Sequence, residues 1–206
     1  LHRSRMRRAF FFVCAAAAAA GLAVTFSRGS YLALLAVIGV FCVFYPRKWQ
    51  LYLLAAAAVL LSTLFLPILR IYGHSMEPAL TDGDIVMALR GGSYERGDVI
   101  AFYSNNKILV KRVIGLPGEW IDIGDDGTVS VDGVPLEGPY LTEKALGECN
   151  IELPYQVPDG RYFVLGDHRS VSSDSRSIAV GCVAEEQIIG RLALRIWPLS
   201  GFGTIE

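Results

Sequence analysis

The distribution of apolar residues divides the chain at about residue 69. Before that position, three long apolar stretches at 9–27, 30–45 and 51–69 are separated by short links. A membrane-spanning helix needs about 20 predominantly apolar residues, within a range of roughly 17–25. The first and third stretches meet this requirement, and the second does so only with help from interfacial residues. The pattern therefore predicts a membrane anchor over residues 1–69, with three transmembrane helices.

A cleavable signal sequence is an alternative interpretation of the first stretch, which has a basic start and an alanine-rich core. The two apolar stretches that follow closely favour an anchor. The arginines near the N-terminus and the basic residues of the 46–50 link place both segments on the cytoplasmic side by the positive-inside rule. Three spans would then put residues 70–206 outside the cytoplasm.

After residue 69 the apolar pattern changes to short β-rich runs separated by Gly- and Asp-containing turns. This pattern is typical of an antiparallel sandwich or barrel, so we expect an all-β domain of antiparallel sheets over residues 70–206. The strongest hairpin signal joins 128–131 to 134–136 through Asp132-Gly133, within a short inserted region at about 124–156. The predicted strands are 84–89, 98–103, 108–114, 120–123, 128–131, 162–165 and 189–197.

Charge follows the same division of the chain. Residues 1–69 carry seven Lys/Arg and no acidic residue, whereas residues 70–206 carry 12 Lys/Arg and 20 Asp/Glu. Such asymmetry indicates an anchor followed by a soluble domain. An acidic domain without a basic stripe argues against nucleic acid as a partner.

The four cysteines indicate no metal centre. Cys14 and Cys42 lie in apolar stretches, where cysteine usually acts as a small hydrophobe. Cys149 and Cys182 have a spacing that matches no metal pattern, and they leave open a disulfide if the domain faces an oxidising compartment. We expect neither a metal nor a cofactor.

Ser75 is a candidate nucleophile, because it follows the last apolar stretch within a few residues and lies in a Gly/Pro-containing turn. A serine hydroxyl needs a base to attack at neutral pH. His74 is a poor base, since adjacent residues of an extended chain point to opposite faces. His168 remains an alternative base, in a Ser/His/Asp set with Asp167 or Asp174.

Lys111 is the other candidate base. Period-2 alternation in the run 108–114 gives neither face a clean polar character, so at least one of Lys111 and Arg112 is drawn onto an apolar surface. On pattern alone, the expected outcome is that both side chains extend to solvent. If Lys111 is buried instead, desolvation can lower a lysine pKa by up to ~3–5 units, enough to make it a base near neutral pH.

Three stretches together resemble the bacterial type I signal peptidases, which are membrane-bound Ser/Lys endopeptidases. Ser75-Met76-Glu77-Pro78 is similar to the nucleophile motif of that family. Residues 97–100 and 111–118 are similar to its lysine motif, and 166–176 to its Gly-Asp-Asn-Arg…Ser-x-Asp-Ser-Arg motif. The motifs occur in the family's order, and the similarity extends from about residue 69 to 197. The resemblance implies a β-rich catalytic fold of the signal peptidase and LexA-like type.

The resemblance also implies roles for individual residues. Ser75 would be the nucleophile, with its backbone N–H in the oxyanion hole, and neutral Lys111 would be the general base. Gly73 stands where some relatives carry a further hydroxyl donor, which implies a hole built from the backbone. Ser172 would orient the lysine, and Asp174 and Arg176 would form a supporting ion pair. Shallow apolar pockets would accept small side chains of the substrate. The residues lining these pockets would be Ile71, Met76, Leu80, Leu109 and Val110.

Three departures from the family pattern are visible. Ala79 replaces a common threonine, His168 replaces the usual asparagine, and the region 124–156 is short. The first predicts the loss of a structural hydrogen bond, and the second keeps the Ser/His alternative open.

The sequence thus predicts an enzyme that removes signal peptides from exported preproteins at the outer face of the bacterial cytoplasmic membrane. Its expected partners are signal peptides, membrane lipid and the secretion translocon. Two other interpretations stay open: a catalytically silent anchored β-domain that binds exported chains, and a peptidase dedicated to one or two substrates.

Overall fold

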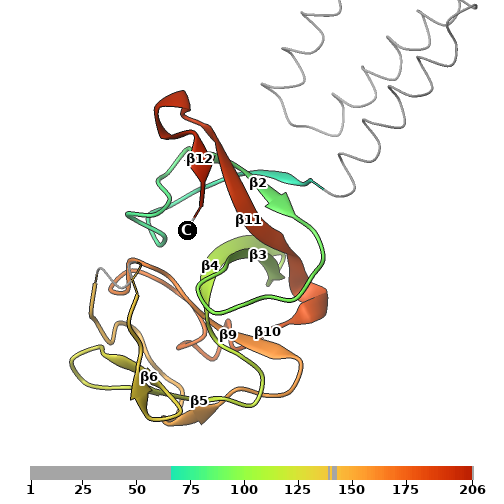
Figure 1. Cartoon of the computed structure of the whole chain (residues 1–206). Helices are drawn as coiled ribbons and strands as arrows, with labels where there is room; N and C mark the ends of the chain where they lie inside the picture. The colour runs from blue at the N-terminus through green and yellow to red at the C-terminus, as the bar shows by residue number, and fades with distance from the viewer. Residues whose placement is uncertain (1–65, 139, 141–142, 206) are drawn as a thin grey trace, which may run out of the picture. The chain divides into compact units, whose positions relative to one another are not determined.

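Two antiparallel sheets make up the part of the chain that the computed structural model describes, which is residues 66–138, 140 and 143–205 (Figure 1). The larger sheet has the order β1 (Ile68–Arg70), β2 (Ile85–Leu89), β11 (Ile188–Trp197), β3 (Val99–Ser104), β4 (Lys107–Gly115), β9 (Arg161–Leu165) and β10 (Val183–Ala184), and β12 (Gly203–Thr204) pairs with β11. The smaller sheet has the order β7 (Val134–Pro135), β6 (Val129–Val131), β5 (Trp120–Ile123) and β8 (Tyr155–Gln156).

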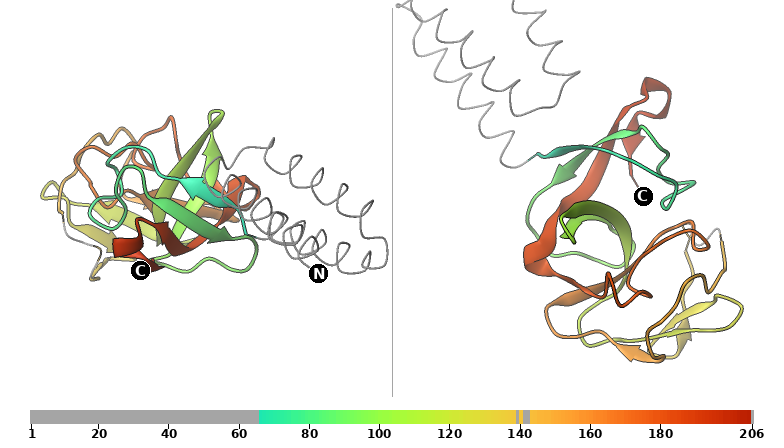
Figure 2. Two further views of the ribbon diagram at one scale, coloured as in Figure 1. Left: turned by 90° about the horizontal axis from the view of Figure 1, so that it is seen from above. Right: turned by 180° about the vertical axis from the view of Figure 1, so that it is seen from behind.

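The two sheets occupy different ends of this β-rich part. In both upright views, β5 and β6 lie at one end, and β12 with the adjoining end of β11 lies at the other (Figures 1 and 2). Two short 3-10 helices, η2 (Glu185–Gln187) and η3 (Leu199–Gly201), flank β11. Within the described residues the predicted all-β, antiparallel character is confirmed.

Strand β4 lies in the middle of the larger sheet, between β3 and β9. Lys111 is opposite Ile100 of β3, and Arg112 is opposite Leu165 of β9. Apolar clusters cover both faces of the sheet here, because Val113 belongs to one cluster and Ile114 to another. A residue in this part of β4 is therefore buried whichever face it occupies.

The predicted strands agree closely with the observed ones. Each of the seven predicted runs overlaps a strand of the structure. The Asp132-Gly133 hairpin joins β6 to β7, and both turn residues have a positive φ, of 51° and 77°. An aspartate and a glycine tolerate this left-handed conformation, as a two-residue hairpin requires. Sequence reasoning missed the short strands β1, β8, β10 and β12.

One predicted boundary is wrong. The third apolar stretch was expected to continue as a helix to residue 69, but Ile68 and Leu69 belong to strand β1, where they pair with Met87 and Val86. Pro67 precedes this strand, and a short apolar strand cannot be told from the end of an apolar helix by hydrophobicity alone.

The predicted spans at 9–27 and 30–45, and most of 51–69, lie outside the described residues. Among the residues that are described, no helix is both long and apolar enough to cross a membrane. Cys149 and Cys182, for which a disulfide was left open, are both free thiols.

Candidate active site

Ser75 lies in the loop between β1 and β2, whose two ends are tied together. The backbone N–H of Ile71 donates to the carbonyl of Asp84 at 2.8 Å, and the N–H of Gly73 donates to the Asp82 carboxylate at 2.8 Å. Gly73 has a φ of +89°, a conformation that glycine adopts at little cost. The loop is thus closed across its base and presents Ser75 near its tip.

Two apolar side chains fix the turn that follows Ser75. Met76 and Leu80 are almost completely buried in a cluster with Ile71, and the N–H of Leu80 donates to the Met76 carbonyl at 2.8 Å. Because burying a side chain of this size is worth roughly 1.5–3 kcal/mol, these anchors hold the turn against the sheet. Ser75 itself stays half-buried.

Lys111 reaches the Ser75 hydroxyl from strand β4. Its Nζ lies 2.6 Å from Ser75 Oγ, a hydrogen-bonding distance, and the lysine is only 3% exposed. Burial lowers the pKa of Lys111 from 10.5 to about 8. Among the neighbouring charges, Asp174 and Asp167 raise this pKa and Arg176 lowers it, but burial outweighs them. The expectation that Lys111 extends to solvent is therefore wrong.

Two buried ion pairs hold Asp167 and Asp174, the carboxylates that raise the pKa of Lys111. Arg112 donates to both oxygens of Asp167, at 2.8 and 2.6 Å, and is itself 1% exposed. Arg176 donates to both oxygens of Asp174, at 2.8 and 2.9 Å. Two-point contacts of this kind fix the geometry of arginine and carboxylate together.

Arg112 also contradicts the expectation of a solvent-exposed side chain, and sequence reasoning missed its pairing with Asp167. A signal was present, because Arg112 shares a strand face with three aliphatic residues, where a buried guanidinium requires a carboxylate. The Gly-Asp pair at 166–167 supplies that carboxylate.

Comparison with known proteins shows the family of this chain. Residues 47–197 match the family described as signal peptidase, peptidase S26. The chain belongs to this family. The resemblance drawn from the three motifs is thereby confirmed, and the chain is a member of a family of peptidases.

Named relatives agree with this membership. Signal peptidase IB of Staphylococcus aureus (strain N315) is 38% identical over 152 residues, which cover 64% of this chain and 78% of the relative. Signal peptidase I of Streptococcus pneumoniae serotype 4 is 29% identical over 198 residues, which cover 77% and 96%. A crystal structure of a signal peptidase I from Enterococcus faecalis V583 has 36% identity and a TM-score of 0.42, and covers 49% of this chain and 97% of that chain.

In this signal peptidase family member, Ser172 differs from what the motif implied. The residue is buried, at 4% exposure, but its Oγ has no hydrogen-bond partner in the part of the chain that the structure describes. A Cβ on Gly166 would overlap both Ser172 Oγ and the Ser75 carbonyl oxygen. Ser172 therefore packs beside the Ser75 segment, and no hydrogen bond joins it to Lys111.

The two histidines of the region bond to groups other than the Ser75 hydroxyl. The backbone N–H of His168 donates to the Ser75 carbonyl at 3.2 Å, and its Nδ1 lies 3.3 Å from the His74 carbonyl oxygen. The exposed His74 imidazole lies 2.7 Å from Glu77, and this contact raises the pKa of His74. Lys111 is the base candidate that the structure brings to Ser75 Oγ.

The five residues implied for substrate pockets do not form one group. Four of them share an apolar cluster, whereas Leu109 packs against a different cluster on the same sheet. Three of the four are almost fully buried, so only their outermost atoms can contact a substrate. The members of the shared cluster are Ile71, Met76, Leu80 and Val110.

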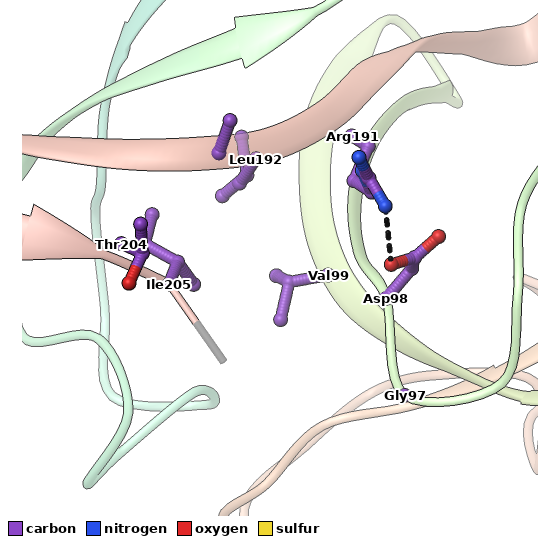
Figure 3. Close-up of a pocket in the computed structure, with 8 residues that line it drawn as sticks. Gly97, Asp98, Val99, Arg191, Leu192, Thr204 and Ile205 are labelled. Atoms are coloured by element: carbon purple, nitrogen blue, oxygen red, sulfur yellow. Dashed lines mark hydrogen bonds and ion pairs between the residues drawn. The ribbon is translucent and has the colours of Figure 1, made fainter. Parts of the chain in front are cut away.

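Neither Ser75 nor Lys111 lines the surface pocket of about 330 Å³ shown in Figure 3. Arg191 points toward Asp98 across its rim, with 3.2 Å between the two charged groups. The lining residues are Gly97, Asp98, Val99, Arg191, Leu192, Ala193, Thr204 and Ile205. Among the described residues, no group of three or more His, Cys, Asp or Glu is arranged to hold a metal ion.

Proposed function

We propose that this chain is a membrane-bound serine endopeptidase that removes N-terminal signal peptides from exported preproteins. The observation that carries the proposal is the 2.6 Å contact between Lys111 Nζ and Ser75 Oγ in a buried setting. Its relatives are named signal peptidase I and IB, in agreement with this function.

Lys111 would act as the general base and then as the general acid. Its neutral amine takes the Ser75 hydroxyl proton while Oγ attacks the carbonyl carbon of the scissile bond. The tetrahedral intermediate collapses to an ester on Ser75, and the protonated Lys111 gives its proton to the departing amine. Water then attacks the ester and loses a proton to Lys111, and Lys111 returns that proton to Ser75 Oγ as the ester bond breaks and the signal peptide leaves.

The arrangement of charges supports a neutral lysine. The two carboxylates that attract a proton to Lys111 are each already held by an arginine, Asp167 by Arg112 and Asp174 by Arg176. Their attraction for an ammonium is therefore largely offset, and the desolvation of Lys111 dominates.

We further propose that the oxyanion hole uses the backbone N–H of Ser75. The N–H of Gly73 is already donated to Asp82, and Gly73 has no side chain to replace it. Apart from residues 72–74 themselves, no described residue has an atom within 4 Å of the position that a Cβ on Gly73 would take, so space remains there for a substrate carbonyl group.

The membrane part of the proposal rests on the sequence. The apolar stretches before strand β1 would anchor the enzyme through three spans, with a cytoplasmic N-terminus, and the chain from Ile68 onward would act on the extracytoplasmic face. Small residues before the cleaved bond would suit the shallow apolar surface that Val110 and its neighbours leave open. Signal peptides and membrane lipid would be its partners, and the secretion translocon would deliver its substrates.

The function is tested by cleavage of a purified preprotein by the full chain in lipid vesicles. The wild type should release the signal peptide, Ser75→Ala should not, and His168→Asn should retain at least about half of the wild-type rate, since the imidazole is bonded away from Ser75 Oγ. Absence of cleavage by the wild type, together with no labelling of Ser75 by a serine-directed acylating reagent, would favour the silent binding domain.

The pH profile gives a second expected result. Because only neutral Lys111 can accept the Ser75 proton, kcat/KM should rise tenfold per pH unit below pH 8 and level off above a midpoint of about 8. The measurement is preprotein cleavage between pH 5.5 and 9.5. A midpoint near the ordinary lysine value of about 10.4 would contradict a buried base.

A further inference from the structure

Arg195, on strand β11, reaches across the fold to the turn that follows Ser75. Its guanidinium donates through Nη2 to the carbonyl oxygen of Ala79, and its Nε lies 3.3 Å from a carboxylate oxygen of Asp84. Ala79 lies within the turn, and Asp84 closes the loop that contains it. One side chain thus contacts two points of the segment that carries the nucleophile.

Asp84 extends this contact into the turn. It is 1% exposed, and its two carboxylate oxygens accept from the backbone N–H and the hydroxyl of Thr81, each at 3.0 Å. The Asp84 backbone N–H donates in turn to the Thr81 carbonyl at 3.1 Å. Arg195, Asp84 and Thr81 therefore form a connected brace at the end of the turn.

The brace is itself held by the C-terminal strands. Arg195 pairs with Val86 of β2 on one side and with Gly203 of β12 on the other. Gly201 packs over the guanidinium, and a Cβ there would lie 3.1 Å from Arg195 Nη1. The side chain is 23% exposed, so the guanidinium is largely enclosed between the Ala79 carbonyl, to which it donates, and the Asp84 carboxylate, with which it forms an ion pair.

We infer that Arg195 is a positioning residue that fixes the turn 76–81 and through it the distance between Ser75 and Lys111. The inference rests on the proposed function. The apolar anchors Met76 and Leu80 hold the turn against the core, and Arg195 fixes its far end. Without the fork, the turn can shift although its apolar side chains stay buried, and a misplacement of about 1 Å can cost on the order of a hundredfold in rate.

Arg195 acts on position and leaves the basicity of the lysine unchanged. The charges that change the pKa of Lys111 are Asp174, Arg176 and Asp167, and Arg195 is not among them. Loss of Arg195 should therefore lower kcat without moving the pH midpoint of the reaction. A change in the ion pairs around Lys111 should move that midpoint.

The test compares Arg195→Met and Arg195→Lys with the control Arg191→Met in the full chain. Arg191 lies on the same strand, has a 47% exposed side chain and pairs with Asp98. We expect kcat to fall about tenfold to a hundredfold in Arg195→Met, with the pH midpoint still near 8, and to stay within about twofold in Arg191→Met. Arg195→Lys should restore part of the loss, because an ammonium can bind one acceptor well but cannot form the planar two-point contact.

Hydrogen exchange of the peptide that contains Leu80 supplies a readout that needs no cleavage. The Leu80 amide is bonded inside the turn, so its exchange should become at least about tenfold faster in Arg195→Met and stay unchanged in Arg191→Met. Wild-type cleavage with an unchanged kcat and unchanged exchange in Arg195→Met would overturn the inference and leave the proposed function intact. Failure of the wild type to cleave would overturn the proposed function, and the catalytic part of the inference with it.

Discussion

Lys111→Met is expected to lower preprotein cleavage by at least about 10³-fold while leaving the protein folded. General acid–base catalysis contributes typically 10²–10⁴-fold, and here one group serves both the attack and the departure of the amine. Methionine fills the volume of the lysine stem but cannot take the Ser75 proton. Single-turnover cleavage in lipid vesicles at pH 8 measures the loss.

The same substitution is expected to increase the free energy of unfolding by up to about 3 kcal/mol at pH 7, which is the cost of lowering a lysine pKa from 10.5 to about 8. The folded state has the lower pKa, so between pH 8 and 10.5 the unfolded chain binds more protons and wild-type stability rises with pH. Below pH 8 the cost of the buried ammonium is complete. The gain from Lys111→Met should therefore be constant below pH 8 and disappear above pH 10.5.

Lys107→Met is the matched control, because Lys107 lies on the same strand and is exposed. It should change the cleavage rate by no more than about twofold and the free energy of unfolding by no more than about 0.5 kcal/mol. If Lys111→Met kept a tenth of the wild-type activity while His168→Asn lost it, the base would be His168. The substituted proteins thus also decide between the two bases that the sequence left open.

The burial of Lys111 and Arg112 shows where sequence reasoning reached its limit. The alternation of residues along β4 indicated that neither face of the strand is polar. Whether Lys111 and Arg112 are exposed depends instead on which strands pair with β4 and what packs over them. Strand β4 lies between β3 and β9, which are separated from it by different distances along the chain. The local sequence pattern does not reveal which strands become neighbours. A strand shows one polar face only where that face meets water, so a strand covered on both faces gives no such signal.

Positions with their own turn chemistry were easier to predict. The hairpin at Asp132-Gly133 depends on two adjacent residues that tolerate a positive φ, and it was placed correctly. The contact of Arg195 with Ala79 joins residues that are 116 positions apart, and nothing near either residue indicates it. The hydrogen bond expected to be lost at Ala79 is one that a threonine side chain would make. The backbone carbonyl of Ala79 does have a partner, because it accepts a hydrogen bond from Arg195.

Arg112→Met is expected to destabilise the domain by about 3–5 kcal/mol, the largest stability effect that we predict for a single substitution. It leaves the Asp167 carboxylate, which is 2% exposed, without its two-point partner in the interior. Urea denaturation followed by fluorescence measures the change. Arg96→Met is the control, because the pair of Arg96 with Glu119 is partly exposed and should contribute at most about 1 kcal/mol.

The double substitution Arg112→Met/Asp167→Leu should regain at least half of the lost stability, because two apolar side chains can replace a buried ion pair when both charges are removed. The single variant should also raise the pH midpoint of cleavage, since an Asp167 without its arginine attracts a proton to Lys111 more strongly. In the double variant this attraction is absent, so the midpoint should fall back to 8 or below. A double variant as unstable as Arg112→Met would show that the guanidinium is needed for its other contacts, with Gly97 and the Tyr140 ring, more than for Asp167.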